Sequence, residues 1–411
     1  MSASTRGWFH PRARAAAFAL AITLAIQAFT SLAATATSVL APEIGRDLGL
    51  APKLVGVFVG LLYAGGMTAS LASGGFVERY GAIRVSQVSV VLCAAGLAMV
   101  VGYAARPAML APLLAVAPVV IGLGYGPITP ASSQILARTA PPSRMALTFS
   151  IKQTGVPAGA ALAGALLPGL ALAQGWRATY LAIAALGIMI IIAAQPTRTK
   201  LDDDRQPGRA ISLAGVFAPL KIVIGTRALA ELAVTGFFYA ATQVCLSSFL
   251  VIYLTETLHF GIVAAGLALT VANIGGIVGR ITWGGTADRW VPPRILLGSI
   301  GVVAALCAFA TAAFGASWSA AIVYVVCAFF GATAIGWNGV QLAEIARQSP
   351  SGQAGTVTGA SGFITFAGVV VGPPVFALLA ATTGSYRVGF LVFGSASLLC
   401  GVSLLMRRRR Q

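Results

Sequence analysis

Long stretches without a single charged residue occupy most of this chain, and they constrain its fold more than any other feature. Eleven such runs lie between 15 and 406, and the longest, 295–343, could cross a membrane twice. A helix needs about 20 apolar residues to span the hydrocarbon core of a bilayer. The runs therefore predict twelve transmembrane helices, at 16–40, 54–77, 85–104, 109–136, 145–171, 177–195, 227–255, 261–285, 295–315, 318–345, 354–381 and 386–406.

Charge is scarce and unevenly placed. Charged residues make up only 9% of the chain, whereas a soluble domain carries about a quarter. The net charge of +17 would suit a nucleic-acid partner. However, most lysines and arginines fall in the terminal segments and loops that lie on the same side of the membrane as the N-terminus. Because positive loops stay inside, both termini are predicted to be cytoplasmic, and no nucleic-acid partner is expected. Short loops and an excess of arginine over lysine favour the inner membrane of a bacterium.

One polar pattern occurs twice, at the ends of the second and eighth predicted helices. The matched residues, 210 positions apart, are Gly74, Gly75, Glu78, Arg79 and Arg84 with Gly284, Gly285, Asp288, Arg289 and Arg294. Because an even number of helices separates the copies, both cross the membrane in the same sense. We therefore expect an all-α membrane protein with two six-helix bundles, at 1–195 and 227–411. The polar segment 196–226, which contains Asp202-Asp203-Asp204, is expected to be a solvated cytoplasmic linker.

The two copies of this loop resemble the signature of the major facilitator superfamily, Gly-x-Leu-Ala-Asp-Arg-x-Gly-Arg-Arg. The first copy departs from that signature at Glu78, which replaces the aspartate, and at Ala82, which replaces the first basic residue after the glycine. The second copy keeps Asp288 and Arg289. The resemblance covers the whole chain and implies a twelve-helix transporter, active as a monomer, that works by alternating access. It also implies that helices 1, 4, 7 and 10 line a central cavity.

The duplicated loop suggests a latch at the membrane face. A small glycine lets helices approach closely, and a carboxylate can pair with an arginine or with the positive end of a helix. The alternative is a solvated loop that only sets topology. The resemblance further implies that Glu344 pairs with Arg289 and Arg280. The gating candidates are Gly74, Glu78, Arg79, Arg84, Arg280, Asp288, Arg289, Glu344 and Arg347.

Lys152 is the most informative single charge, because it lies inside the fifth predicted helix. An ionisable group at such a depth is a functional candidate by default, although a lysine stem can also carry its amine to the interface. Polar side chains on the helices implied to line the cavity are the other candidates, unless they only bond helix to helix. The substrate-binding candidates are Gln27, Ser31, Tyr125, Lys152, Gln153, Tyr239, Gln243, Trp337 and Asn338, with Thr129 nearby on the fourth helix.

These features predict a secondary transporter rather than an enzyme. The chain has no phosphate-binding Gly-x-x-x-x-Gly-Lys-[Ser/Thr] loop, and its two histidines, His10 and His259, fall outside the predicted helices, so we expect no ATP, metal or other cofactor. The expected ligand is a small organic anion, most simply a carboxylate drawn to Lys152, moved with protons or by exchange. One alternative is proton-driven efflux of amphipathic drugs, and another is a sensor or membrane enzyme built on a transporter fold.

Overall fold

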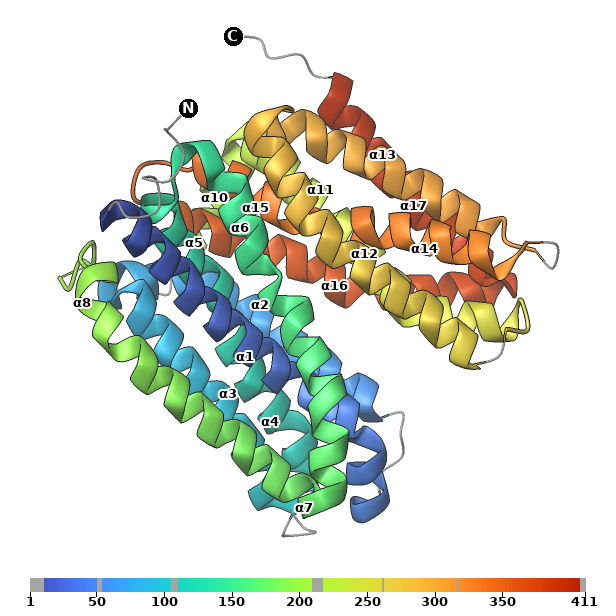
Figure 1. Ribbon diagram of the computed structural model, residues 1–411, viewed down its shortest axis with the longest axis horizontal. Helices are drawn as coiled ribbons and strands as arrows, with labels where there is room; N and C mark the ends of the chain where they lie inside the picture. The colour runs from blue at the N-terminus through green and yellow to red at the C-terminus, as the bar shows by residue number, and fades with distance from the viewer. Residues whose placement is uncertain are drawn as a thin grey trace, which may run out of the picture. The chain divides into compact units, whose positions relative to one another are not determined.

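The computed structural model describes residues 11–49, 54–104, 110–208, 217–260, 262–315 and 318–406, and within these ranges the regular structure is helical (Figure 1). His10 lies outside them. The helices are α1 (Pro11–Leu48), α2 (Leu54–Tyr80), α3 (Ala82–Ala104), α4 (Leu110–Tyr125), α5 (Ile128–Thr139), α6 (Met145–Gln153), α7 (Gly155–Ala194), α8 (Arg198–Leu201), α10 (Ala218–Gly225), α11 (Arg227–Glu256), α12 (Ile262–Arg289), α13 (Pro293–Ala312), α14 (Ala320–Ala334), α15 (Asn338–Gln348), α16 (Ala354–Thr383) and α17 (Tyr386–Met406).

Ten stretches of the described chain are long and apolar enough to cross a membrane. One of them, Pro142–Leu201, holds two crossings, because Gly175 inside α7 has a φ of 82° and a ψ of 154°. The chain turns back within α7, near the α7 label in Figure 1. The 28-residue helix α12 provides a further apolar crossing. The described ranges therefore contain the twelve predicted crossings, and the all-helical fold is confirmed.

Two of the crossings are broken at matched positions. The fourth is divided into α4 and α5 at Gly126-Pro127, and the tenth into α14 and α15 around Gly336. These glycines are 210 positions apart, which is the offset of the duplicated loop. Gly126 lies against the Gly66 carbonyl of α2, where a Cβ atom would not fit, whereas Gly336 lies against the Ala332 carbonyl of its own preceding turn. The break at Gly126 thus depends on a close approach to the α2 backbone.

The described residues form two compact units. The first comprises residues within 1–142, 152–222 and 349–363, and the second comprises residues within 143–151, 223–348 and 364–411. They differ from the predicted bundles in the two short segments 143–151 and 349–363, each of which clusters with the other half of the sequence. These segments hold the starts of α6 and α16, so the start of each helix is anchored by the opposite half.

In the first unit α1 packs along α7, while α4 packs against both α2 and α3. Small residues make the α2–α4 contact possible, because a side chain at Gly65 or Gly122 would meet the facing backbone. Tyr180 is fully buried in this unit's core, and its hydroxyl is 2.9 Å from the Thr37 hydroxyl.

In the second unit α13 packs along α17, and α12 packs along α14. Gly275 and Gly331 bring α12 and α14 together in the same manner as the glycines of the first unit. The core is more aromatic here, with the Phe376 and Phe390 rings at 5.1 Å and nearly perpendicular. The repeat therefore conserves the close helix contacts while the core composition differs.

Candidate functional site

Lys152 lies at the end of α6, where the chain passes through Thr154 into α7, and only 1% of it is exposed. Its ammonium donates to the Gln27 side-chain oxygen at 2.6 Å and to the Gln153 side-chain oxygen at 3.0 Å. A longer contact of 3.5 Å reaches the Thr129 hydroxyl. These three contacts are all made to neutral oxygens, and the amine is buried rather than extended to a membrane surface.

The local sequence explains how α1 and α7 bring these groups together. Gly155 lies directly against the Gln27 side chain, and Gly159 lies against the Ala28 carbonyl, so a side chain at either position would push the helices apart. The Ser31 hydroxyl donates to the Val156 carbonyl at 2.6 Å across the same contact. Gln27 is thereby held where the Lys152 ammonium can reach it.

The remaining candidates of the first unit have less direct positions. Ser31 is buried and uses its hydroxyl in the contact between α1 and α7. Tyr125 is half-buried at the end of α4, and its ring meets the Tyr63 ring edge-on at 6.3 Å. Thr129 lies in the first turn of α5, and its hydroxyl donates to the Gln27 oxygen at 3.3 Å. Of the predicted residues in this unit, Gln27, Lys152 and Gln153 form one cluster.

In the second unit the predicted residues divide into two kinds. Tyr239 and Trp337 are buried, their rings meet at 5.6 Å, and both use their polar groups on backbone carbonyls, of Leu297 and Ala334 respectively. Gln243 and Asn338 are half-buried, and within the described ranges their side-chain amides have no hydrogen-bond partner. Only this second pair therefore has polar groups available to a ligand.

Asp288 holds the start of α6. Its two carboxylate oxygens accept hydrogen bonds from the backbone amides of Ala146 at 2.9 Å and Leu147 at 2.7 Å. Arg347 donates to the same carboxylate at 3.2 Å. A carboxylate at a helix N-terminus satisfies amides that have no partner in the helix and interacts favourably with the helix dipole. Gly284, one turn earlier in α12, lies directly against Leu147 and Ser150 of α6.

Glu78 holds the start of α16, at the equivalent place in the first unit. The Thr356 hydroxyl donates to its carboxylate at 2.5 Å. Gly74 lies against Thr356, so closely that a Cβ atom at this position would collide with it. The two copies of the repeated loop thus meet the starts of two different helices, each from the opposite half of the sequence.

The basic gating candidates are placed differently from the prediction. Arg347, which follows Glu344 by three residues, pairs with it at 3.8 Å as well as with Asp288. Arg289 is exposed and has no ion pair within the described ranges, so the expected pair of Arg289 and Glu344 is wrong. The reason is geometric, because Arg347 lies on the same helix face as Glu344.

Arg280 is also placed away from Glu344. It is buried well inside α12, and its Nε donates to the Ile335 carbonyl at 3.2 Å, at the break between α14 and α15. Arg79 lies over the Tyr80 ring, at 5.3 Å, and the Arg84 backbone amide donates to Asp202. Neither Arg79 nor Arg84 has an ion pair within the part of the chain that the structure describes.

The structure also brings in residues that the sequence did not single out. Asp202, expected in a solvated linker, is buried, and its carboxylate accepts hydrogen bonds from the Ile83 and Arg84 amides at 2.7 and 3.1 Å. It therefore caps α3, and the interpretation of this residue as solvated is wrong. No local signal marks it, because an acid that caps a distant helix has the same sequence as a solvated one.

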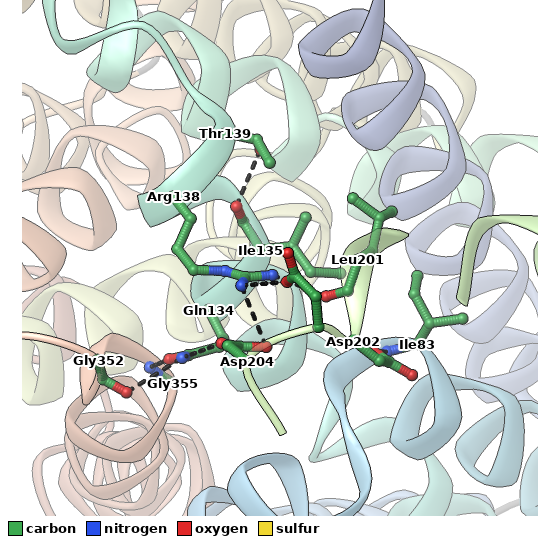
Figure 2. A network of polar contacts seen from close by, with 11 residues as sticks. Ile83, Gln134, Ile135, Arg138, Thr139, Leu201, Asp202, Asp204, Gly352 and Gly355 are labelled. Carbon is green, nitrogen blue, oxygen red and sulfur yellow. Dashed lines mark hydrogen bonds and ion pairs between the residues drawn. The ribbon is translucent and has the colours of Figure 1, made fainter. Parts of the chain in front are cut away.

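Figure 2 shows the polar network around the same segment. The Gln134 side chain donates to Asp204 and to the Gly352 carbonyl, at 2.8 and 3.0 Å, and accepts from the Gly355 amide at 2.9 Å. Arg138 pairs with Asp203 at 2.6 Å and with Asp204 at 3.3 Å. One glutamine thus connects α5, the linker and the start of α16.

The pKa values of two acids in this network are shifted in opposite directions. Burial raises the pKa of Asp202, against the lowering effects of its two amide hydrogen bonds and of Arg198. The Arg138 hydrogen bond lowers the pKa of the neighbouring Asp203, which is largely exposed. The network therefore contains one carboxyl that binds its proton more tightly than usual and one that releases its proton more readily than usual.

The family described as Major Facilitator Superfamily matches residues 23–373. The hexuronate transporter of Bacillus subtilis is 21% identical over 390 residues, which cover 90% of this chain and 89% of that protein. The gentisate transporter of Corynebacterium glutamicum is 24% identical over 315 residues, which cover 71% of this chain and 66% of that protein.

Among solved structures, the chain is similar to the fucose:proton symporter of E. coli. The TM-score is 0.79 at 17% sequence identity, with 96% of this chain and 100% of that chain covered. At this identity the likeness shows the fold alone.

Proposed function

We propose, on the premise that this chain belongs to the major facilitator superfamily, that it moves a small organic anion, most simply a carboxylate, by alternating access. Proteins of this family are membrane transporters that bind small molecules, so the chain is a multi-pass membrane transporter and not an enzyme. The substrate class is the part that we add.

The buried ammonium of Lys152 carries this proposal. Removing a charge from water costs several kcal/mol, and hydrogen bonds recover part of that cost. The oxygens of Gln27, Gln153 and Thr129 are neutral, so these three hydrogen bonds solvate the ammonium but supply no opposite charge themselves. A carboxylate can supply both a hydrogen bond and the opposite charge.

The contact distances suggest where such a ligand enters. The Thr129 hydroxyl makes the longest of the three contacts, at 3.5 Å, and is the easiest to replace. Thr129 lies in the first turn of α5, beside the break in the fourth crossing, where the chain already departs from regular helix. We expect a carboxylate oxygen to take this position while Gln27 and Gln153 keep the amine oriented.

The similar proteins support the same class of substrate. The two relatives are named as transporters of hexuronate and of gentisate, and both compounds carry a carboxylate. At 21% and 24% identity these names do not transfer directly, but they agree with an anion held by a lysine. Gln243 and Asn338 of the second unit stay predicted ligand contacts.

We assign the gating role to the contacts of Glu78 with Thr356 and of Asp288 with α6. Each joins the two halves of the sequence through a few hydrogen bonds, and such contacts can break and form during alternating access. Gly74 and Gly284 permit the approach, and Arg347 supports Asp288. We also place the protein in a bacterial inner membrane with both termini cytoplasmic, on the distribution of its arginines and lysines.

Uptake into proteoliposomes tests the proposal. Hexuronates, hydroxybenzoates and short dicarboxylates are compared with lipophilic cations, with and without an imposed pH gradient. We expect carboxylate uptake, and a fall of roughly tenfold or more in Lys152→Gln, because a hydrogen bond to a charged group contributes about 1.5–3 kcal/mol. Dependence on the gradient would assign proton symport, whereas stimulation by internal substrate would assign exchange.

Lys221→Gln is the matched control, since it removes an exposed lysine from α10. Its uptake should equal that of the wild type. Transport of lipophilic cations that survives Lys152→Gln, without carboxylate transport, would overturn the proposal and favour drug efflux instead.

A further inference from the structure

A groove of about 870 Å³ runs along the first unit between α2 and α3, and the transport proposal does not involve it. Its walls come from the last three turns of α2 and the first three turns of α3, with Leu123 and Pro127 of the fourth crossing below. The helices α2 and α3 both pack on α4, so α4 forms the floor. The groove is thus a long depression on one bundle.

The walls of the groove are apolar along its length. Phe76 of α2, Val88 of α3 and Leu123 of α4 are all exposed and line it. From Arg84 to Leu92 the α3 wall extends roughly 12 Å at about 1.5 Å per residue. A surface of this kind within the hydrocarbon region suits an acyl chain, because the side chains exposed along it are apolar and the two lining serines, Ser73 and Ser89, are buried.

One end of the groove is strongly basic. Four arginines line it, namely Arg79, Arg84, Arg198 and Arg205. They share a membrane face because α2 ends at Tyr80, α3 begins at Ala82, and the segment after α7 returns to the same place, where Asp202 caps α3.

Little of this positive charge is neutralised. Arg198 approaches the Asp202 carboxylate at 3.8 Å. Arg79, Arg84 and Arg205 form no ion pair within the described ranges. Since Arg79 lies over the Tyr80 ring at 5.3 Å, the N–H groups at the edge of its guanidinium stay available. Guanidinium groups bind phosphate oxygens through paired hydrogen bonds.

We propose that this groove binds one anionic phospholipid of the surrounding bilayer, with an acyl chain between α2 and α3 and the phosphate among the four guanidinium groups. A soluble anion would leave the apolar walls unused, and a zwitterionic lipid would bring an ammonium group to an already basic end. Basic pockets at membrane faces are known to select anionic headgroups. The ligand thus matches both the shape and the charge of the groove.

Native mass spectrometry of the full-length protein in detergent tests the site. The protein is titrated with phosphatidylglycerol or phosphatidylcholine that carry the same acyl chains. We expect one tightly retained phosphatidylglycerol, with occupancy at least about fivefold above phosphatidylcholine, since each arginine near the surface favours an anionic lipid. Glycerol phosphate at equal concentration should not displace it.

Two variants separate the charge from the apolar walls. Arg84→Gln combined with Arg205→Gln should reduce phosphatidylglycerol binding by roughly tenfold, because two of the four cations are lost. Val88→Trp fills the groove from an exposed position without changing charge, and should also reduce binding. Arg46→Gln with Arg177→Gln is the control, because these arginines pair with Glu43 and Asp47.

Equal retention of the two lipids by the wild type would overturn the proposal. Retention of phosphatidylglycerol by both groove variants would do the same. Displacement by glycerol phosphate would assign the basic end to a soluble anion and remove the lipid from the groove. A loss of binding in the control variant equal to that in the arginine variant would show a general charge effect and contradict a specific site.

Discussion

The two copies of the repeated loop perform the same task with different partners. Asp288 accepts hydrogen bonds from two backbone amides of α6 and forms an ion pair with Arg347. Glu78, one methylene longer, reaches the side-chain hydroxyl of Thr356 in α16. A backbone amide is present whatever the residue, whereas a hydroxyl depends on one side chain. The Asp288 contact is therefore protected against substitutions in α6, and the Glu78 contact is sensitive to a single change in α16.

The supporting arginines differ in the same way. Arg138 and Arg347 occupy matched positions at the ends of α5 and α15. Arg347 pairs with the loop acid Asp288, but Arg138 pairs with Asp203 and Asp204 of the linker. In the first unit, Arg138 thus pairs with acids of the linker between the halves, and not with the loop acid Glu78. Duplicated sequences need not keep duplicated contacts.

Removing the carboxylate of Asp288 should have the largest effect. Asp288→Ala leaves two helix-start amides and Arg347 without their partner, and a hydrogen bond to a charged group contributes about 1.5–3 kcal/mol. We expect the uptake rate in proteoliposomes to fall by about tenfold or more. Asp288→Asn should be intermediate, because its amide oxygen can still accept one hydrogen bond. Glu43→Gln, an exposed acid, is the control, and wild-type uptake by Asp288→Ala would contradict the latch.

Thr356→Val should have a smaller but clear effect. It keeps the shape of the side chain and removes the hydroxyl that binds Glu78, at a cost of about 1 kcal/mol, so we expect uptake to fall roughly fivefold. Thr356→Ser should retain most activity. In a double-mutant cycle with Glu78→Gln, the second substitution should add little, because contacting residues are not additive. Full additivity would show that the two side chains act independently.

Arg347→Gln should reduce uptake by about two- to threefold, since a partly exposed ion pair contributes up to about 1 kcal/mol. Arg289→Gln, next to Asp288 in the repeated loop, should leave uptake unchanged because Arg289 has no ion pair in the described part of the chain. The same initial-rate assay measures both. A larger loss of uptake in Arg289→Gln than in Arg347→Gln would support the sequence-based assignment of Arg289 to the latch.

The smallest expected effect is that of Asp202 on the pH dependence of unfolding. Burial raises the pKa of Asp202 in the folded protein, so the native state binds the proton more tightly than the unfolded state. The contribution of Asp202 is therefore full below its ordinary pKa of about 3.9. It is lost as pH rises through the raised value.

We expect the melting temperature of the wild type, relative to Asp202→Asn, to fall by at most about 2 °C across that window. The matched helix start in the second unit, at Pro292 of α13, has no side-chain cap and should add no such dependence. A melting temperature of the wild type that rises, relative to Asp202→Asn, as pH rises through that window would contradict the assigned direction.

Much of the fold could be predicted from the sequence, because the bilayer imposes length and composition on every crossing. The breaks at Gly126 and Gly336 could not, since glycine is common in membrane helices and only the three-dimensional surroundings distinguish these two. Lys152 was identifiable as a charge in an apolar run. Its contacts with Gln27 and Thr129 depend on how α1, α5 and α6 are packed, which no local pattern contains.

The errors have a common physical origin. Arg289 was expected to pair with Glu344, but Arg347 is three residues from that acid on the same helix and pairs with it instead. Asp202 was expected to be solvated, yet it caps α3 over a separation of 119 residues. Sequence shows which groups are charged, whereas the choice between equivalent partners depends on three-dimensional distance.

The acids that cap α3 and neutralise Arg138 make the linker a structural component of the first half. A transporter assembled from two separately translated polypeptides should therefore be divided after Gly208, beyond Asp202, Asp203 and Asp204. Division at the end of the last apolar run would give an amino-terminal fragment with a bare helix end and an unpaired guanidinium. The functional boundary of the first gene segment thus lies a dozen codons beyond the boundary of its membrane helices.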